Sequence, residues 1–293
     1  MRINNTPPFR PPAEADSLIL QIDEGCPWNR CTFCGMYKTQ RYRQRPIDEV
    51  AALIQQESSH CPDAARIFLA DGDVMHRPYE DLLSILQMLG EHFPHLKRVN
   101  LYANGSSIVS KSAAQLSEWQ KHRLHTLYMG LESGHPEILR DCDKGDTPEI
   151  MVDAARKARG AGLRMSVMVL LGLGGRKRSR EHAVHTAEVL NRMQPRLLSC
   201  LRVIPVPGTR LHRETQNNDF TMLTEHEITS ELRDMVALLE LKGTIFRANH
   251  SSNIIPLEAR FPHDKQQLLE TLDTMLASGR LDSNTPGSMP MWL

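Results

Sequence analysis

Three cysteines lie close together near the start of the chain, in the stretch GCPWNRCTFCGMYK (25–38). Cys26 is separated from Cys31 by four residues, and Cys31 from Cys34 by two. Thiolates are ligands for soft metals, but a structural zinc site is normally closed by four ligands. Three thiols therefore indicate a [4Fe–4S] cluster whose fourth iron stays open and binds a small molecule.

Two other interpretations of the cysteine loop stay open. The same two gaps occur in plant-type [2Fe–2S] proteins, where Cys61 would be the distant fourth ligand of a non-catalytic electron carrier. Alternatively, His60 and Cys61 would complete a zinc site that stabilises a binding module. Metal and sulfide analysis separates the three hypotheses, because only the first predicts about four irons and four sulfides.

The balance of charge and the hydropathy exclude several classes of protein. The 35 Lys and Arg residues balance 35 Asp and Glu residues, which gives no electrostatic support for nucleic-acid binding. No stretch approaches the roughly 20 apolar residues that cross a bilayer. The proline-rich start (1–16) has no apolar run, so we expect a flexible lead-in and a cytoplasmic protein. In that compartment clustered thiols bind metals more often than they form disulfides.

Short apolar runs alternate with helical patterns along the chain. Nearly continuous apolar runs are typical of strands that are covered on both faces. The strands expected are LILQID (18–23), RIFLAD (66–71), RVNLYA (98–103), HTLYMGLE (125–132), LRMSVMVLLG (163–172) and LLSCLRVIP (197–205). Successive strands are about 30 to 50 residues apart, the length of a βαβ unit. The pattern predicts an α/β fold with a parallel sheet, either doubly wound or curled into a partial barrel.

Helical periods fill the intervals between these strands. Apolar stripes recur at helical spacing in 47–54, 82–89 and 184–193. In the segment 147–162, Thr147 suits the N-cap, Pro148 the first turn, and Gly160 or Gly162 the end. Towards the C-terminus we expect a helix near 225–241, a short strand within 243–265 and a last helix at about 266–277.

Acids and glycines gather where the expected strands end. The segments that follow the second to sixth strands are ADGDVMH (70–76), Asn104 with Gly105, GLESGH (130–135), GLGG (172–175) and IPVPGT (204–209). Each one alone is compatible with ordinary turn chemistry. Because the catalytic groups of parallel barrels lie past the carboxyl ends of the strands, the whole set predicts one functional edge.

With these motifs in this order, residues 17–210 resemble the radical S-adenosylmethionine (SAM) superfamily. GLESG (130–134) is similar to the branch that holds anaerobic coproporphyrinogen oxidases and methylthiotransferases, but the subfamily is not assigned. The resemblance implies a partial (β/α)6 TIM-like barrel with a short C-terminal extension. It also implies that Cys26, Cys31 and Cys34 hold a [4Fe–4S] cluster whose open iron is chelated by SAM.

The function implied by the resemblance is that of a radical SAM enzyme. Such an enzyme cleaves SAM reductively to a 5′-deoxyadenosyl radical, which abstracts hydrogen from a substrate that is unknown here. An external electron donor of the flavodoxin or ferredoxin type is expected, and no membrane partner. The domains expected are a lead-in (1–16), the core (17–210), a helical and strand extension (211–280) and a frayed tail (281–293).

The resemblance implies SAM contacts in the cysteine loop and in four further segments. Phe33, just before the last cysteine of the loop, would lie against the adenine. Gly72 and Asp73 stand where the family has a Gly-Gly-Glu-like stretch that meets the amino group of SAM. Glu132 would lie near the bound SAM. The remaining expected cofactor-binding residues are Asn104, Gly172 and Gly174, and no catalytic residue is assigned.

The sequence departs from the family pattern at two places. Four residues instead of three separate the first two cysteines, and Asp73 and Asp71 replace a usual glutamate and a usual small residue. The substrate contacts considered are the basic run KTQRYRQR (38–45) and the segment RANHSSN (247–253), both of which are also compatible with solvated loops.

We predict that replacing Cys26, Cys31 or Cys34 by Ala removes the brown chromophore of the purified protein, because each thiolate is needed to hold the cluster. Cys61→Ala is the matched control and is expected to retain the colour. Loss of the cluster in the Cys61 variant, measured by iron and sulfide content, would support the ferredoxin-like interpretation instead.

Overall fold

The computed structural model describes residues 9–288, and the chain forms two compact units. The first contains the residues up to Asn29, Met36–Met129 and Arg156–Met165. The second contains Arg30–Gly35, Gly130–Ala155 and the residues from Ser166 onward. Residues 1–8 of the predicted lead-in and 289–293 of the predicted frayed tail lie outside the described residues.

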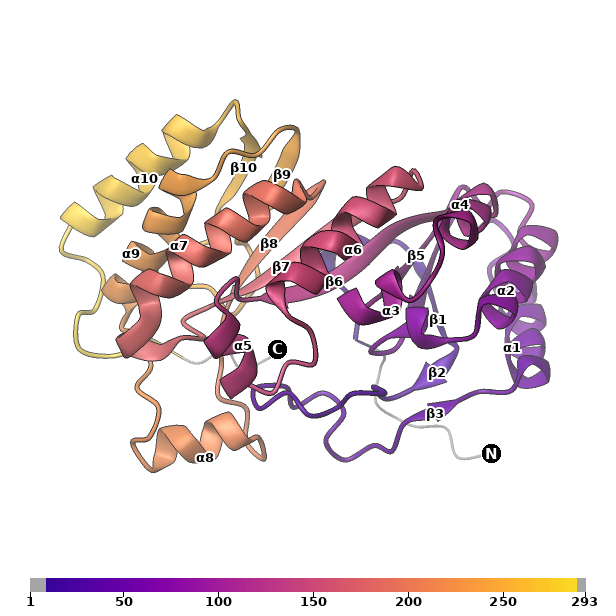
Figure 1. The fold of residues 1–293 in the computed structure, drawn as a ribbon, viewed down its shortest axis with the longest axis horizontal. Helices are drawn as coiled ribbons and strands as arrows, with labels where there is room; N and C mark the ends of the chain where they lie inside the picture. The colour runs from indigo at the N-terminus through magenta and orange to yellow at the C-terminus, as the bar shows by residue number, and fades with distance from the viewer. Residues whose placement is uncertain (1–8, 289–293) are drawn as a thin grey trace. The chain divides into compact units, whose positions relative to one another are not determined.

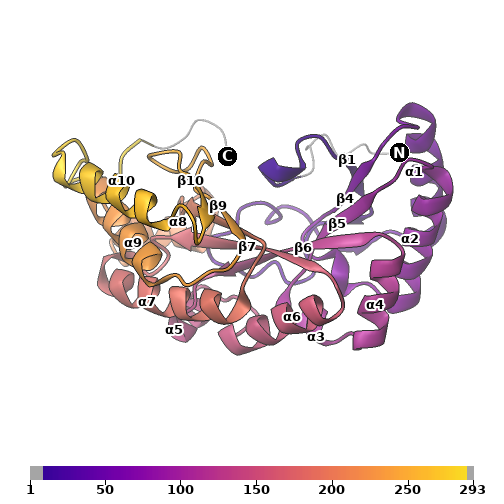
Figure 2. The same ribbon diagram turned by 90° about the horizontal axis from the view of Figure 1, so that it is seen from above.

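Parallel strands form the centre of the first unit. In hydrogen-bonding order they are β1 (Leu18–Gln21), β4 (Arg66–Ala70), β5 (Arg98–Tyr102) and β6 (Leu124–Glu132), the last of which also contributes residues to the second unit. Helices α1 (Ile47–His60), α2 (Tyr79–His92) and α4 (Ala113–Lys121) belong to the same unit, and Figure 2 shows α1 and α2 along one side of the strands. Residues 67–70 of β4 are fully buried, as expected for a strand that is covered on both faces.

The first unit also contains several short elements, two of which flank the cysteine loop. Strand β2 (Asp23–Glu24) pairs antiparallel with β3 (Arg43–Gln44), so the chain before the loop is joined to the chain after it. The remaining short elements are η1 (Pro12–Glu14), η2 (Val74–His76) and α3 (Gly105–Val109).

The second unit continues the α/β pattern (Figure 1). Strands β7 (Arg164–Leu171), β8 (Leu197–Arg202) and β9 (Thr244–Arg247) are parallel, and β10 (Glu258–Phe261) pairs antiparallel with β9. Helix α9 (Glu225–Leu238) packs against both α7 (Gly175–Met193) and α10 (Lys265–Ala277). The other helices are α5 (Pro136–Asp141), α8 (Arg210–Gln216) and α6 (Pro148–Gly160), of which α6 contributes to both units.

Each end of the described chain is held by a buried charged residue. Glu14 is 1% exposed and accepts hydrogen bonds from Ser17 Oγ (2.6 Å), from Asn100 Nδ2 (2.8 Å) and from the hydroxyl of Tyr128. Near the other end, Arg202 donates to the carbonyl oxygens of Ser252 and Ser288, both at 2.7 Å. The described parts of the lead-in and of the tail therefore have defined partners.

The predicted α/β fold with a mainly parallel sheet is confirmed. All six expected strands form, and helix α6 begins with the amide of Ile150 donating to Thr147 Oγ1 at 3.3 Å. Two strands, β9 and β10, occupy the tail segment in which one was expected. Within residues 9–288, no helix has the length and apolar character needed to cross a membrane.

Candidate functional site

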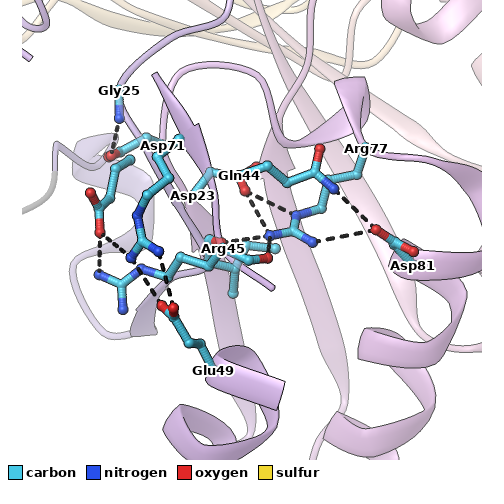
Figure 3. A network of polar contacts seen from close by, with 11 residues as sticks. Asp23, Gly25, Gln44, Arg45, Glu49, Asp71, Arg77 and Asp81 are labelled. Atoms are coloured by element: carbon cyan, nitrogen blue, oxygen red, sulfur yellow. Dashed lines mark hydrogen bonds and ion pairs between the residues drawn. The ribbon is translucent and has the colours of Figure 1, made fainter. Parts of the chain in front are cut away.

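Asp71 joins the start of the cysteine loop to a later residue of the loop. It is 1% exposed, and its Oδ2 accepts from the amide of Gly25 (3.0 Å) and from Gln21 Nε2 (2.8 Å). The hydroxyl of Tyr37 donates to Oδ1 at 3.4 Å. Burial raises the pKa of Asp71, and these donors oppose the rise. Figure 3 shows Asp71 directed at Gly25, so this aspartate positions the loop rather than facing a ligand.

Arg77 clamps the chain on both sides of the same loop (Figure 3). Its side chain is fully buried and donates to Asp23 Oδ1 through Nε at 3.0 Å and Nη2 at 2.7 Å. Nη2 also donates to the carbonyl oxygens of Ile22 (2.7 Å) and Arg45 (2.8 Å), which precede and follow the loop. Burial raises the pKa of Asp23 even though the guanidinium opposes it. The clamp fixes the distance between the two ends of the loop.

The six cysteines, all within residues 9–288, form no disulfide. Cys26 packs against Gly72, where an added Cβ would lie 2.6 Å from the Cβ and 3.0 Å from the Sγ of Cys26. Only glycine therefore fits at position 72, and the expected contact of Gly72 with the cofactor stays a prediction. Cys31 and Cys34 belong to the second unit, where the amide of Cys34 donates to the Cys31 carbonyl at 3.3 Å.

Within residues 9–288, no three His, Cys, Asp or Glu side chains are already gathered as a metal site. The donor chemistry nevertheless fits an iron–sulfur cluster, because three thiols that form no disulfide share one loop and metal binding commonly orders its own ligands. The other cysteines differ from them. Cys61 is exposed after α1, whereas Cys142 and Cys200 are buried, and burial raises the pKa of Cys142 to about 12.

Asp73 and Asn104, both expected to bind the cofactor, contact each other in the first unit. Asp73 Oδ1 accepts from the amide of Asn104, and Oδ2 from its side-chain Nδ2, each at 3.1 Å. Ser107, which the sequence interpretation missed, donates to Oδ2 at 2.6 Å. The carboxylate is 4% exposed and fixes the segment that follows β5.

Glu132 ends β6 in a left-handed conformation, with φ of 61°, and forms an ion pair with Lys144. The distance between Lys144 Nζ and Glu132 Oε1 is 3.3 Å, and each side chain is at most 12% exposed. An added Cβ at Gly130 would lie 1.9 Å from Glu132 Oε1. The space beside Gly130 is therefore filled by the carboxylate of Glu132 itself.

Lys144 was missed by the sequence interpretation because a single lysine twelve positions after Glu132 has no distinctive spacing. Burial disfavours its charged form, but Glu132 and the thiol of Cys31 outweigh that effect and raise its pKa. A cation that stays charged therefore lies near one of the three loop thiols, within the second unit.

Phe33, Gly172 and Gly174 lie together in the second unit. Phe33 packs against the apolar cluster formed by Ile138, Cys142, Leu173, Val203 and Leu211. Gly172 has a φ of 80°, and its amide donates to Glu231 Oε1 at 2.7 Å. Gly174 precedes α7 and lines a cavity of about 240 Å³ that also borders Thr32 and Leu173. The structure thus brings three of the expected cofactor-binding residues to one apolar region.

The two segments considered as substrate contacts make internal contacts. In the basic run, Arg43 pairs with Glu24 at 2.9 Å, and Lys38 donates to the carbonyl of Asn29 at 2.8 Å. In the later segment, Asn253 Nδ2 donates to the Cys200 carbonyl at 2.8 Å. Substrate contact at either place stays a prediction.

A family model described as the radical SAM superfamily matches residues 20–190, which is more than half of the chain. A curated relative, the uncharacterized methyltransferase PH0819 of Pyrococcus horikoshii, is 23% identical over 209 residues. That alignment covers 66% of this chain but only 40% of the relative, so the chain matches less than half of the relative's length.

Two solved structures share the fold. Coproporphyrinogen III oxidase (HemN) from Escherichia coli, described as a radical SAM enzyme, aligns with a TM-score of 0.60 and 17% identity over 75% of this chain and 51% of its own. Methylornithine synthase (PylB) aligns with a TM-score of 0.54 and 16% identity over 88% of this chain and 81% of its own. At such identities the likeness concerns the fold alone, and it confirms the expected α/β fold of the partial-barrel kind.

We predict that Arg77→Met lowers the free energy of unfolding by roughly 3–5 kcal/mol, because it leaves Asp23 as a buried carboxylate without its cation. Urea unfolding followed by circular dichroism measures the loss. Arg43→Met is the matched control, since that arginine forms ion pairs with Glu24 and Glu49 at the surface. An equal loss of unfolding free energy in the two variants would contradict the role of Arg77 in holding the two ends of the loop.

Proposed function

Because the chain belongs to the radical SAM superfamily, we propose that it is an enzyme that cleaves SAM reductively and abstracts hydrogen from a substrate not yet identified. In this proposal, Cys26, Cys31 and Cys34 hold a [4Fe–4S] cluster, which when bound supplies the electron for the cleavage. The observation that supports the proposal most is a loop with three cysteines, none of them in a disulfide, whose two ends are held by buried polar residues.

The clamp supports the cysteines' role because a ligand loop must keep its thiols within reach of one another. Asp71 binds Gly25, next to Cys26, and also binds Tyr37, which follows Cys34. Arg77 joins the carbonyls of Ile22 and Arg45. These contacts limit the loop to a narrow range of end-to-end distances without occupying the thiols.

Lys144 supports the same role electrostatically. Three thiolates place several negative charges in one loop, and a nearby cation favours that ionised state. The ammonium of Lys144 stays charged beside Cys31, as its raised pKa indicates. Lys144 also pairs with the carboxylate of Glu132, so it lies between Cys31 and this expected SAM contact.

In the proposed complex, Glu132 accepts a hydrogen bond from SAM with the part of its carboxylate that Lys144 leaves unused, because a carboxylate has about four acceptor sites. Phe33 and the segment from Gly172 to Gly174 border the adenine, and the apolar cluster behind Phe33 supports this role. Asp73 and Asn104 contribute through the backbone that their mutual hydrogen bonds fix.

The electron for the reaction is proposed to come from a separate donor of the flavodoxin or ferredoxin type. A single [4Fe–4S] cluster passes on one electron and must then be reduced again. The substrate stays open. Methyl transfer, the activity in the name of the Pyrococcus relative, is one of the outcomes that product analysis should cover.

The proposed function is tested by reducing reconstituted protein anaerobically with SAM. We expect slow formation of 5′-deoxyadenosine even without substrate, detected by chromatography and mass spectrometry. A protein with about four irons and four sulfides that forms no deoxyadenosine under strong reduction would refute the proposal. Incubation with cell extract, followed by a search for SAM-dependent mass changes, then identifies the substrate.

We predict that Glu132→Gln keeps the cluster and weakens SAM binding by about ten- to a hundredfold, which corresponds to one lost charge-assisted hydrogen bond of roughly 1.5–3 kcal/mol. Calorimetric titration with SAM measures the affinity, and a thermal melt measures the contribution of the ion pair to stability.

Lys144→Gln is the matched control because it also breaks the ion pair but keeps the carboxylate. We expect a similar fall in melting temperature and a smaller loss of SAM affinity. If Glu132→Gln lowers the melting temperature and leaves the affinity unchanged, Glu132 serves only to pair with Lys144.

A further inference from the structure

Two turns of the second unit carry residues of the proposed SAM site, and both have left-handed backbone. Glu132 follows β6 with a φ of 61°, and Gly172 follows β7 with a φ of 80°. A left-handed glutamate is held against an intrinsic conformational cost, so its surroundings must fix it. The contacts of the two turns converge on a set of buried polar side chains from α7 and α9.

Glu231 of α9 holds the second turn. Its side chain is fully buried, its Oε1 accepts from the amide of Gly172 at 2.7 Å, and its Oε2 accepts from Ser179 Oγ at 2.6 Å. Burial raises the pKa of Glu231 to about 7, although both donors oppose the rise. A carboxyl group in such a place is costly unless its hydrogen bonds are satisfied, and the turn supplies one of them.

His182 of α7 holds the first turn. Its Nδ1 lies 2.8 Å from Ser133 Oγ, which also accepts from the amide of His135 at 3.0 Å. Burial lowers the pKa of His182 to about 4, so its imidazole is neutral at pH 7. The adjacent amide of Gly134 donates to Thr186 Oγ1 at 2.9 Å, which fastens the turn to the same helix.

The two holding residues face each other. His182 Nε2 lies 3.7 Å from Glu231 Oε1, and both side chains are fully buried. A chain of polar contacts therefore runs from Ser133 through His182 and Glu231 to the amide of Gly172. An apolar core of similar volume is often at least as stable as buried ionisable groups, so stability alone does not require this chain. His182 Nε2 forms no hydrogen bond within the described residues, so the hydrogen bonds that join the two turns pass through α7, which carries both His182 and the Ser179 that donates to Glu231. Hydrogen-bonded groups of this kind favour one arrangement of the elements that they join.

We propose that Ser133, His182 and Glu231 are positioning residues, which hold the Glu132 turn and the Gly172 turn in one fixed relation and thereby pre-organise the binding of SAM. This inference rests on the proposed function, because it concerns the same site. The residues act through the backbone of the turns and do not themselves contact the ligand.

The experiment compares Glu231→Met with Glu231→Gln in the reconstituted protein. Methionine leaves the amide of Gly172 without its acceptor, whereas glutamine restores an acceptor at the same place. We expect the methionine variant to bind SAM roughly tenfold or more weakly and the glutamine variant to bind within about threefold of wild type. Calorimetric titration gives both affinities.

A second measurement needs no SAM. Amide hydrogen exchange on the SAM-free protein should become faster in Glu231→Met at residues 132–135 as well as at 172–175, although Glu231 contacts only the second turn. Ser133→Ala should produce the reciprocal effect at 172–175. Thr244→Val is the matched control. It removes another buried hydrogen bond of the second unit, from Thr244 Oγ1 to the Pro195 carbonyl at 2.6 Å, which is not part of the polar contacts between Ser133 and Gly172.

The outcomes separate this inference from the proposed function. If wild-type protein with an intact cluster does not bind SAM, the proposed function fails, and with it the role of the turns in SAM binding. If wild type binds SAM but Glu231→Met merely lowers the melting temperature, as Thr244→Val does, the positioning role is overturned. The positioning role is also overturned if amide exchange becomes faster only in the turn that the substituted residue contacts directly.

Discussion

The burial of the Arg77 guanidinium is the constraint on which the cysteine loop depends. A charged group without access to water must be surrounded by acceptors, since leaving it unpaired costs several kcal/mol by rough estimate. Arg77 meets that requirement through Asp23 and the carbonyls of Ile22 and Arg45. The two ends of the loop cannot separate without removing acceptors from a buried cation.

The second unit uses the same principle at the ends of β6 and β7. Glu132 keeps a left-handed backbone because Lys144 binds its carboxylate and Gly130 leaves space for it. The amide of Gly172 is directed by the buried Glu231. In both turns a carboxylate is buried, which is unfavourable unless the carboxylate is paired. Its partners are in reach only in the local arrangement that the structure has. Such pairs contribute little as net stabilisers, but they select one geometry for the turn.

The sequence predicted the strands and most helices because their signals are local. A run such as RIFLA is apolar at nearly every position, and it is buried as expected in β4. Short helices were missed despite a local signal. Helix α4 begins with a capping box formed by Ser112 and Gln115, which can be recognised from the Ser-x-x-Gln spacing.

The site was predicted only in part, because its decisive contacts join residues far apart in the chain. Arg77 and Asp23 are separated by 54 positions, and Gly172 and Glu231 by 59. A pairing of this kind leaves no period or spacing in a single sequence. The motifs at the strand ends did bring Asp73 and Asn104 together, since neighbouring parallel strands end at the same edge. Their direct contact, and the role of Ser107, required the structure.

The contacts also show what Asp71 and the gap between the first two cysteines do, the two places where the sequence was expected to depart from the radical SAM pattern. Asp71, where a small residue was expected, accepts hydrogen bonds from Gly25 and Gln21 at the base of the loop. The gap between the first two cysteines contains Asn29, whose φ of 44° places it in the left-handed region that asparagine tolerates well. Its Nδ2 donates to the Tyr37 carbonyl at 2.7 Å. Asp71 and Asn29 thus both hold the loop through contacts with Tyr37, one with its hydroxyl and one with its carbonyl.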